Sequence, residues 1–433
     1  MKYYIETYGC QMNVYDSGKL EETLKDSSFS ETSNPGEADL ILVNTCSVRQ
    51  HAEDRAFARI GELGRVRQRT RAVLAVCGCM AQRLGPEMLK TRGVDIVVGP
   101  DAYPGLLTAF EKSRATGTKT LDTTRDSGFR FRASSQRAAH GLRVFVSIMK
   151  GCSNECSFCI VPVVRGPAVS RPHQEVLEEV ETFVERGVKD ITLIGQNVNA
   201  YDDGVVGFAQ LFRMTADTAR CSRVRFTTSH PKDMTDSVIE VMSACKNICE
   251  HLHLPLQSGS NRVLGRMRRG YTTERYKNVV KAVRDAVPGI SVTTDIIVGF
   301  PGETIEDFES TCVLIEELGF DSAFTFKFSP RPGTDAASMA DDVPRAEKER
   351  RLSELISIER RVSSAKSASL VGTVMEVLVE AEKEKGEERF LLGRTRCNRT
   401  IRLNGSKEMI GRFVNVRVES SKGISLSGCI VRD

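Results

Sequence analysis

A short loop with three closely spaced cysteines constrains this chain more than any other feature. Cys152, Cys156 and Cys159 form a C-x3-C-x2-C pattern directly after the apolar run Val144–Met149. One loop of this spacing can wrap around one inorganic cluster, and three thiolates leave one iron of a [4Fe–4S] cluster without a protein ligand. A zinc site is the main alternative. Zinc usually takes four ligands in paired CxxC form, and the nearest downstream histidine is His173.

Apolar runs at regular spacing after this loop predict strands that alternate with helices. Helices fill the gaps, for example at His173–Glu185 and Thr273–Val287. Six such units predict an incomplete barrel of the TIM type, with its chemistry at the carboxyl ends of the strands. The predicted strands are Val144–Met149, Asp190–Ile194, Arg223–Thr228, His251–Leu256, Ser291–Val298 and Ser322–Phe328.

The N-terminal third also alternates, which favours a parallel sheet covered on both faces. Its predicted strands are Lys2–Thr7, Asp39–Val43, Ala72–Val76 and Asp95–Val98. Cys10, Cys46 and Cys79 each lie three residues past a predicted strand, so parallel strands would bring these thiols to one sheet edge. We expect them to hold a second cluster with one open iron. Cys77 is a rival ligand, although it lies nearer the strand and is expected to point into the core.

Composition excludes several classes of protein. Of 433 residues, 40% are hydrophobic and 27% charged, which is typical of a globular chain with substantial cores. Thirteen cysteines, an odd number in a long chain without a visible secretory signal, do not indicate a disulfide framework. No apolar run approaches the ~18 residues of a membrane helix. We therefore expect no membrane association and a cytoplasmic location.

From residue 367 onward, short apolar runs alternate with Gly and Asn turns. The predicted strands are Gly372–Glu380, Glu388–Thr395, Thr400–Leu403, Gly411–Val418 and Gly423–Val431. Five short strands predict a small closed barrel, a shape that often binds nucleic acid. From Leu391 to Asp433 nine basic residues exceed three acidic ones, although the whole chain has a formal net charge of only +4. The candidates for RNA contact are Arg394, Arg396, Arg399 and Arg402, unless they form the solvated face of a strand.

The whole chain is thus expected to be an α/β protein of three domains. The predicted parts are an N-terminal parallel-sheet domain at 1–122, a basic linker at 123–142, a partial (βα)6 barrel with a trailing helix at 143–366, and an all-β barrel at 367–433. A run of four arginines in the central domain could be a solvated helix face or could hold RNA phosphates. Its members are Arg262, Arg266, Arg268 and Arg269.

The cysteine loop resembles that of radical S-adenosylmethionine (SAM) enzymes. There, the amino and carboxylate groups of SAM bind the open iron, and one electron breaks the sulfonium bond to give a 5′-deoxyadenosyl radical. Phe158 and Ile296–Thr304 resemble segments beside adenine, and Gly195-Gln196-Asn197 resembles the segment near the methionine amino group. The resemblance implies SAM contacts at Phe158, Gly195, Gln196, Asn197, Gly299, Pro301 and Gly302, with Ser229 and Gln257 as weaker candidates.

Nearly the whole chain resembles the radical SAM methylthiotransferase family. The motifs that carry the resemblance are, in order, YGCQMN, NTCSVR, CGCMAQR, the C-x3-C-x2-C loop, HLPLQSGS, GYTTERY, TTDIIVGFPGET and a tail similar to a TRAM domain. It implies two [4Fe–4S] clusters: an auxiliary one on Cys10, Cys46 and Cys79, and a radical one on the catalytic Cys152, Cys156 and Cys159. Val163-Val164 departs from the family, in which a more polar pair is expected.

The resemblance also implies an activity. It is the conversion of N6-isopentenyl(dimethylallyl)adenosine at tRNA position 37 to its 2-methylthio derivative, with SAM as methyl donor and radical source. The GCQMN segment is typical of this tRNA branch, and threonylcarbamoyladenosine of tRNA or a ribosomal protein is the alternative substrate. The implied partners are tRNA and an electron donor of the flavodoxin or ferredoxin type, and a monomer is expected. A non-catalytic RNA-binding protein with structural zinc or cluster sites is the alternative from another class.

Overall fold

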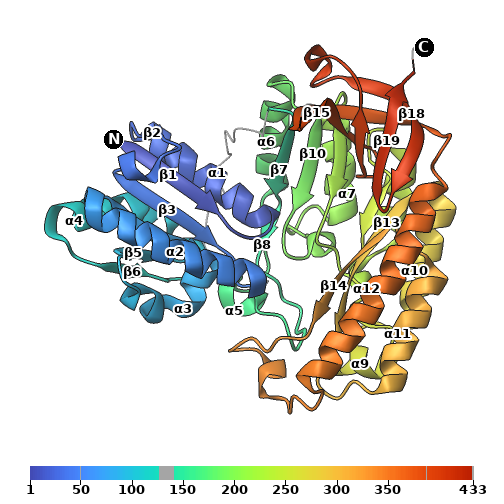
Figure 1. The fold of residues 1–433 in the computed structure, drawn as a ribbon, viewed down its shortest axis with the longest axis horizontal. Coiled ribbons are helices and arrows are strands. Elements are labelled where there is room, and N and C mark those ends of the chain that lie inside the picture. Colours follow the sequence, from blue (N-terminus) through green and yellow to red (C-terminus); the bar gives the residue numbers. More distant parts are fainter. Residues whose placement is uncertain (49, 126–140, 387, 432–433) are drawn as a thin grey trace.

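The computed structural model describes residues 1–48, 50–125, 141–386 and 388–431. They form an N-terminal parallel sheet, a central strand–helix domain and a small C-terminal barrel (Figure 1). The predicted α/β class and the order of the three parts are confirmed. Most of the predicted basic linker lies outside the described residues. In the described ranges no helix is both long enough and apolar enough to cross a membrane.

The N-terminal domain is a six-stranded parallel sheet with helices on both faces. Its elements are β1 (Lys2–Thr7), α1 (Gln11–Asp26), β2 (Ser30–Glu31), β3 (Leu40–Thr45), α2 (Gln50–Thr70), β4 (Val73–Gly78), α3 (Cys79–Lys90), β5 (Ile96–Val98), α4 (Leu106–Thr116) and β6 (Thr120–Asp122). The strand order is β2-β1-β3-β4-β5-β6. The inner strands β3 and β4 are buried throughout because helices cover both faces. The four predicted strands are confirmed, and the short edge strands β2 and β6 are additional.

The central domain contains the six predicted strands, all parallel to their paired neighbours. They are β7 (Arg143–Ser147), β10 (Asp190–Ile194), β11 (Arg223–Phe226), β12 (His251–His253), β13 (Ser291–Val298) and β14 (Ser322–Lys327). The helices between them are α5 (Val161–Arg165), α6 (His173–Glu185), α7 (Phe208–Thr218), α8 (Asp236–Ala244), α9 (Asn261–Arg266), α10 (Thr273–Ala286) and α11 (Ile305–Leu318). A two-stranded ribbon, β8 (Met149–Lys150) and β9 (Val169–Ser170), flanks the cysteine loop.

The central sheet is split between β11 and β12. Pairing joins β11-β10-β7 and β12-β13-β14, whereas in the described ranges a single isolated bridge, Val224 with Ile248, connects the two halves. β12 ends at His253, three residues before the predicted end at Leu256, because Pro255 has no N–H for the ladder. The predicted partial barrel is therefore confirmed in an open form.

The C-terminal barrel follows a long helix. Helix α12 (Arg345–Ala368) runs beside β14, where Glu359 accepts a hydrogen bond from the Ala323 amide. The barrel is closed in the order β15-β16-β17-β19-β18. Its strands are β15 (Val374–Lys385), β16 (Glu388–Thr395), β17 (Thr400–Leu403), β18 (Phe413–Lys422) and β19 (Ser425–Ile430). The predicted five-stranded closed barrel is confirmed.

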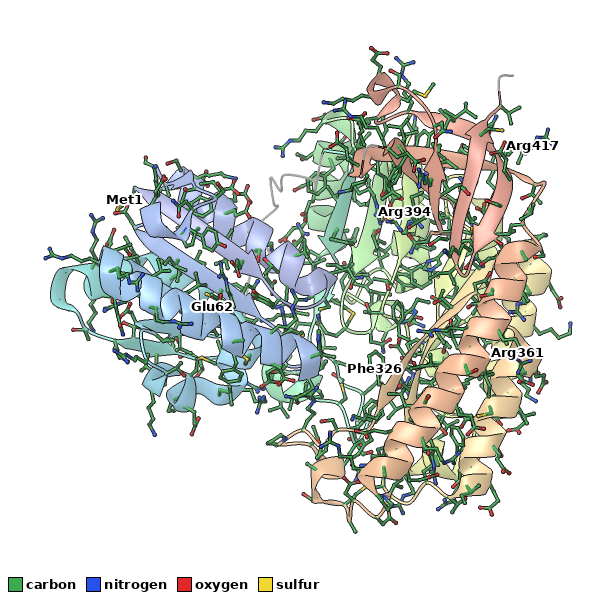
Figure 2. All side chains as sticks on the ribbon, in the orientation of Figure 1. Met1, Glu62, Phe326, Arg361, Arg394 and Arg417 are labelled. Carbon is green, nitrogen blue, oxygen red and sulfur yellow. The ribbon has the colours of Figure 1, made fainter. Side chains whose placement is uncertain are left out.

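The C-terminal barrel docks on the amino ends of the central strands. Arg223, the first residue of β11, donates to Glu376 Oε1 at 2.8 Å. Arg225, two residues further on, is buried and donates from Nη2 to Asp190 Oδ2 at 2.7 Å. Figure 2 shows Arg394 at this junction of the two domains. The carboxyl ends of the same strands are left for the cysteine loop.

Replacing Arg225 by methionine should destabilise the central domain beside this junction, where Arg225 pairs with Asp190 and also donates to the Arg396 carbonyl of the barrel. Asp190 is fully buried, so losing its partner leaves an uncompensated charge, which costs about 3–5 kcal/mol. Lys281→Ala is the control, because Lys281 and Asp285 form an exposed i,i+4 pair worth about 0.3–0.5 kcal/mol. Thermal unfolding of both variants checks the prediction. Equal midpoints for Arg225→Met and Lys281→Ala would contradict it.

Candidate cluster and cofactor site

The first cysteine trio lies in the loop between β8 and α5. The loop is fixed by backbone bonds from Cys152 N to Gly166 O at 3.1 Å and from Cys159 N to Cys156 O at 3.0 Å. The amide of Asn154 donates to Cys152 Sγ at 3.4 Å. Burial raises the pKa of Cys152, and it raises that of Cys159 to about 12. These thiols therefore stay protonated near neutral pH until a metal displaces their protons.

The side chain of Arg269 contacts Cys156 of this trio. Its Nη1 donates to Cys156 Sγ at 3.2 Å, while Nη2 donates to the Pro255 carbonyl at 3.3 Å and Nε donates to Tyr271 Oη at 3.1 Å. The residue is 5% exposed, so it is neither a solvated helix residue nor a phosphate ligand. His230 Nε2 lies 3.9 Å from Cys156 Sγ, and burial lowers the pKa of this imidazole to about 2, so it is neutral.

The second trio gathers at the carboxyl edge of the N-terminal sheet, as predicted from the strand ends. Cys10 precedes α1, Cys46 follows β3, and Cys79 is the first residue of α3. The thiols of Cys10 and Cys46 share a hydrogen bond, which lowers the pKa of Cys10 to about 6 and raises that of Cys46. Val48 N donates to Cys46 Sγ at 3.3 Å. The rival Cys77 is buried in the core on one sheet face.

Arg165 joins the two cysteine sites. It is the last residue of α5, six positions after Cys159, and its Nε donates to Cys79 Sγ at 3.1 Å. Its Nη2 donates to Asp16 Oδ2 at 2.6 Å on α1. Val164 packs against Cys79, so an apolar side chain is suited to the position where the family resemblance predicts a polar one. The spacing of the cysteines gave no indication of this bridge.

Further contacts fix the N-terminal domain against the central one. Arg331, in the loop after β14, donates to Gln50 Oε1 at 2.6 Å and to the Val48 carbonyl at 3.3 Å. Lys150 pairs with Asp101 at 2.8 Å. These contacts lie beside the Cys46 loop and beside the first trio, respectively. Charged side chains thus hold the two cysteine-bearing loops in one arrangement.

The donors in each trio are cysteine thiols that accept N–H hydrogen bonds, and thiolates are the usual ligands of iron–sulfur clusters. Across the described ranges, no three His, Cys, Asp or Glu side chains converge closely enough to hold one metal ion. A zinc ion needs four ligands around one point. A [4Fe–4S] cluster instead distributes its cysteines over different irons, so their sulfurs stay further apart. Buried thiols that accept N–H bonds from the backbone and from arginine suit such a cluster.

Three predicted SAM contacts offer unused acceptors. Gln196 Oε1, Asn197 Oδ1 and Gln257 Oε1 are buried without a hydrogen-bond partner in the described structure. They lie just past β10 and just past β12. Asn197 Nδ2 donates to Asp233 Oδ2 at 2.7 Å, which fixes the amide orientation. Because buried polar atoms are rarely left unpaired, these oxygens fit a polar ligand at the carboxyl ends of the strands. The Ser229 hydroxyl already donates to a backbone carbonyl at 2.5 Å.

The predicted turn after β13 is held by arginine and lysine side chains. Gly299 and Gly302 have φ of +68° and +76°, which favour glycine. A Cβ on Gly299 would lie 2.4 Å from Lys348 Cγ, and one on Gly302 would lie 2.8 Å from the Arg266 guanidinium carbon. Arg266 Nε also donates to the Pro301 carbonyl at 2.9 Å. Close packing within the protein thus accounts for both glycines, and their contact with SAM stays a prediction.

Phe158 and Gly195 complete the predicted cofactor contacts. Phe158 is partly buried and packs edge-to-face against Phe300, with ring centroids 6.4 Å apart. A Cβ on Gly195 would lie 2.5 Å from Met149 Cγ, so the ribbon beside the cysteine loop requires a glycine there. Phe158 lies within the cysteine loop and Gly195 packs against Met149, three residues before Cys152, and the contact of both with SAM also stays a prediction.

All four arginines predicted to bind RNA form ion pairs. Arg394 pairs with Glu380, Arg396 with Glu250 and Arg399 with Asp321, at 2.6–2.8 Å. Glu250 and Asp321 belong to the central domain, so Arg396 and Arg399 hold the C-terminal barrel in place. Arg402 pairs with Glu388 within the barrel and also lies over the Phe390 ring, 4.1 Å from its centroid. RNA contact by these four residues stays a prediction, and Figure 2 shows Arg417 on the outer side of the barrel instead.

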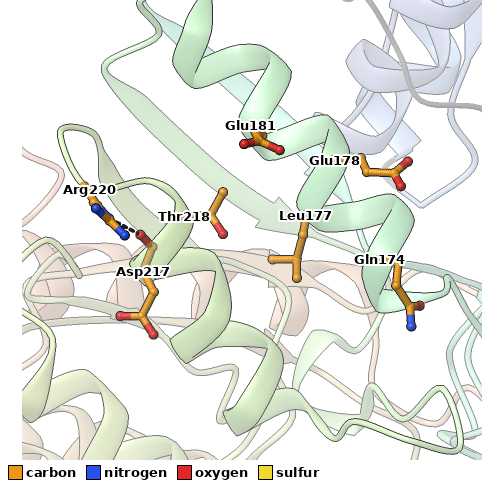
Figure 3. A pocket seen from close by; sticks show the side chains of 7 residues that line it. All are labelled: Gln174, Leu177, Glu178, Glu181, Asp217, Thr218 and Arg220. Carbon is orange, nitrogen blue, oxygen red and sulfur yellow. Dashed lines mark hydrogen bonds between the residues drawn. The ribbon is translucent and has the colours of Figure 1, made fainter.

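A groove between α6 and α7 is separate from the cysteine sites (Figure 3). Its volume is about 480 Å³, and Glu178, Glu181 and Asp217 make its lining acidic. Arg220 bonds to the Asp217 carbonyl at one end. None of the predicted site residues lines it, and it lies on the outer helices of the central domain.

In metal-free protein, Cys10 should be alkylated above about pH 6. The thiolate is the nucleophile, and the hydrogen bond with Cys46 lowers the Cys10 pKa to about 6. Labelling with iodoacetamide should therefore reach half its maximal rate near that pH, read by peptide mass spectrometry. Cys46→Ala should shift the profile to higher pH because it removes the main cause. An unchanged profile in Cys46→Ala would refute this pairing.

Three sequence profiles match separate parts of the chain. The Radical SAM superfamily matches residues 146–315, the Uncharacterized protein family UPF0004 matches residues 2–99, and the TRAM domain matches residues 368–431. Two solved radical SAM proteins share the fold. TsrM from Kitasatospora setae covers 77% of this chain and 76% of its own at a TM-score of 0.59 and 14% identity. OxsB covers 83% and 56% at a TM-score of 0.54 and 12% identity.

Relatives match over the full length. The tRNA-2-methylthio-N(6)-dimethylallyladenosine synthase of Carboxydothermus hydrogenoformans is 42% identical over 436 residues, 99% of each chain. The enzyme of the same name from Syntrophomonas wolfei is 41% identical over 440 residues, 100% of this chain and 98% of its own. Motifs, fold and full-length identity agree, and the chain belongs to the radical SAM methylthiotransferases, in the family of the tRNA-2-methylthio-N(6)-dimethylallyladenosine synthases.

Proposed function

We propose that this chain converts N6-isopentenyladenosine at position 37 of tRNA to its 2-methylthio derivative. The observation that carries the proposal is the pair of three-cysteine sites joined by α5 and Arg165. Carbon 2 of adenine is neither acidic nor a good electrophile, so replacing its hydrogen requires both a radical source and a sulfur carrier. The substrate is supported by the names of the relatives at 41–42% identity.

Each cysteine trio is given one cluster in this proposal. The radical cluster is assigned to Cys152, Cys156 and Cys159, and the auxiliary cluster to Cys10, Cys46 and Cys79. When bound, the first cluster and SAM supply the radical that an unactivated C–H bond requires. SAM is the methyl donor as well.

The surrounding residues orient the cofactor and limit access of water. Gln196, Asn197 and Gln257 offer acceptors for the amino and hydroxyl groups of SAM. Arg165 and Arg331 hold the N-terminal domain against the loops that carry the reaction. Exclusion of water from the site would protect a radical from side reactions.

The proposed partners follow from this reaction. The macromolecular substrate is tRNA in the cytoplasm, and the electron comes from a low-potential donor of the flavodoxin or ferredoxin type. The chain is proposed to act as a monomer, since both cysteine sites and the SAM contacts come from one chain. Contacts of the C-terminal barrel with the anticodon arm are expected on its exposed cations.

Nucleoside mass spectrometry tests the activity. Reconstituted protein, SAM, dithionite and tRNA carrying N6-isopentenyladenosine should yield the 2-methylthio nucleoside under anaerobic conditions. Cys156→Ala should form neither this product nor 5′-deoxyadenosine, yet it should still bind the tRNA. SAM cleavage without a methylthio product would contradict the proposed substrate. The substrate would then be threonylcarbamoyladenosine of tRNA or a ribosomal protein. Zinc without iron in the purified protein would refute the enzyme proposal.

Iron content separates Cys79 from its neighbour Cys77. Cys79→Ala should reduce iron from about eight to about four atoms per chain, because the auxiliary site loses a ligand. Cys77→Ala is the matched control, since Cys77 is buried in the sheet core and should keep all the iron. Metal analysis and the visible spectrum after reconstitution measure both. Loss of iron in Cys77→Ala, with Cys79→Ala unaffected, would reverse the assignment.

A further inference from the structure

Two buried arginines each donate a hydrogen bond to one thiol of a different cysteine trio. Arg269 Nη1 lies 3.2 Å from Cys156 Sγ, and Arg165 Nε lies 3.1 Å from Cys79 Sγ. Arg269 is 5% exposed and Arg165 is 7% exposed. Neither can be replaced by water without a rearrangement, so both are permanent neighbours of whatever the cysteines bind.

The two arginines differ in how their charge is compensated. Arg165 forms a buried ion pair with Asp16, at 2.6 Å from Nη2 to Oδ2. Arg269 has only uncharged partners besides the thiol, namely the Tyr271 hydroxyl and the Pro255 carbonyl. In the described structure no carboxylate lies within ion-pair distance of Arg269. The first trio therefore has a net positive neighbour, and the second has a neutral pair.

Charge and hydrogen bonds at the sulfurs set the reduction potential of an iron–sulfur cluster. A cluster held by three thiolates gains one negative charge when it accepts an electron. A buried, uncompensated cation stabilises that added charge strongly, because the surroundings have a low dielectric constant. A guanidinium already neutralised by a carboxylate stabilises it much less.

We infer that Arg269 and the Arg165–Asp16 pair set the two clusters to different potentials, so that a single electron goes to the cluster that faces SAM. The inference rests on the proposed function. One electron from a low-potential donor, such as dithionite or a reduced flavodoxin-type protein, reduces the radical cluster from the 2+ to the 1+ state, and the donor is oxidised by one electron. The auxiliary cluster remains in the 2+ state. Arg269, Arg165 and Asp16 are positioning residues that act through the cysteines.

The experiment measures the potential of each cluster separately in the full-length chain. The variant with Cys10, Cys46 and Cys79 all changed to Ala keeps only the radical cluster. The variant with Cys152, Cys156 and Cys159 all changed to Ala keeps only the auxiliary cluster. Redox titrations followed by electron paramagnetic resonance give the midpoint potentials, and iron analysis confirms that the remaining site is filled. The radical cluster should have the higher potential.

In the radical-cluster chain, Arg269→Gln should lower the equilibrium constant for reduction at least tenfold, about 59 mV for one electron. Arg269→Lys keeps the charge and should recover part of the shift. The matched control is Arg268→Gln, from the same arginine run, because Arg268 pairs with Asp335 on the surface. An unchanged potential in Arg269→Gln with full iron would overturn the inference.

In the variant that keeps only the auxiliary cluster, Asp16→Asn should raise the equilibrium constant for reduction by a similar factor. The substitution removes the negative charge that compensates Arg165. The double variant Arg165→Gln with Asp16→Asn replaces one neutral pair by another and should stay near the starting value. An unchanged potential in Asp16→Asn would overturn the inference even if Arg269→Gln failed to assemble a cluster. These potentials do not depend on the tRNA. Failure to form a methylthio product therefore leaves them intact and counts only against the proposed function.

Discussion

The buried Arg165 guanidinium is the interaction on which the arrangement of the site depends. Arg165 belongs to the central domain, in the helix that follows the first cysteine loop. Its guanidinium group donates hydrogen bonds to Cys79 and Asp16 of the N-terminal domain. Removing one partner of a buried ion pair costs several kcal/mol, so loss of the Arg165 side chain should strongly destabilise the contact between the two domains. The relative position of the two domains, and with it the relation of the two cysteine sites, follows from this contact and from Arg331 on the other side.

The local pattern of apolar residues was sufficient to predict the bounds of several strands that carry the site. β1, β10 and β13 begin and end where the apolar runs predict, and a turn with a glycine (Gly9, Gly195 or Gly299) follows each of them. The edge strands β2 and β6 have two and three residues, too few for a periodic signal. The split between β11 and β12 depends on pairing across the sheet, and nothing in the local sequence marks it.

The positions of the cysteines were predictable because one trio is close together in the sequence and the other follows the ends of parallel strands, which meet at one sheet edge. Arginines were not, since their roles depend on partners far away in the sequence. Arg269 looked like part of a solvated basic run, yet its partner is the cysteine loop, 113 positions earlier. Arg396 and Arg399 looked like an RNA-binding face, yet their partners Glu250 and Asp321 lie in another domain. Net charge along a segment predicts an electrostatic surface only when the opposite charges are not supplied from elsewhere.

The C-terminal barrel sits at the amino ends of the central strands, whereas the cysteines sit at the carboxyl ends. The eight residues of β13 span about 26 Å at about 3.3 Å each. A ligand held by the outer barrel therefore has to extend over at least the height of the central domain before it meets the cysteines. A free nucleoside is far shorter than that, whereas a folded nucleic-acid arm can bridge it. If the barrel holds one end of the substrate, as proposed above, the site suits a long folded nucleic acid better than a free nucleoside.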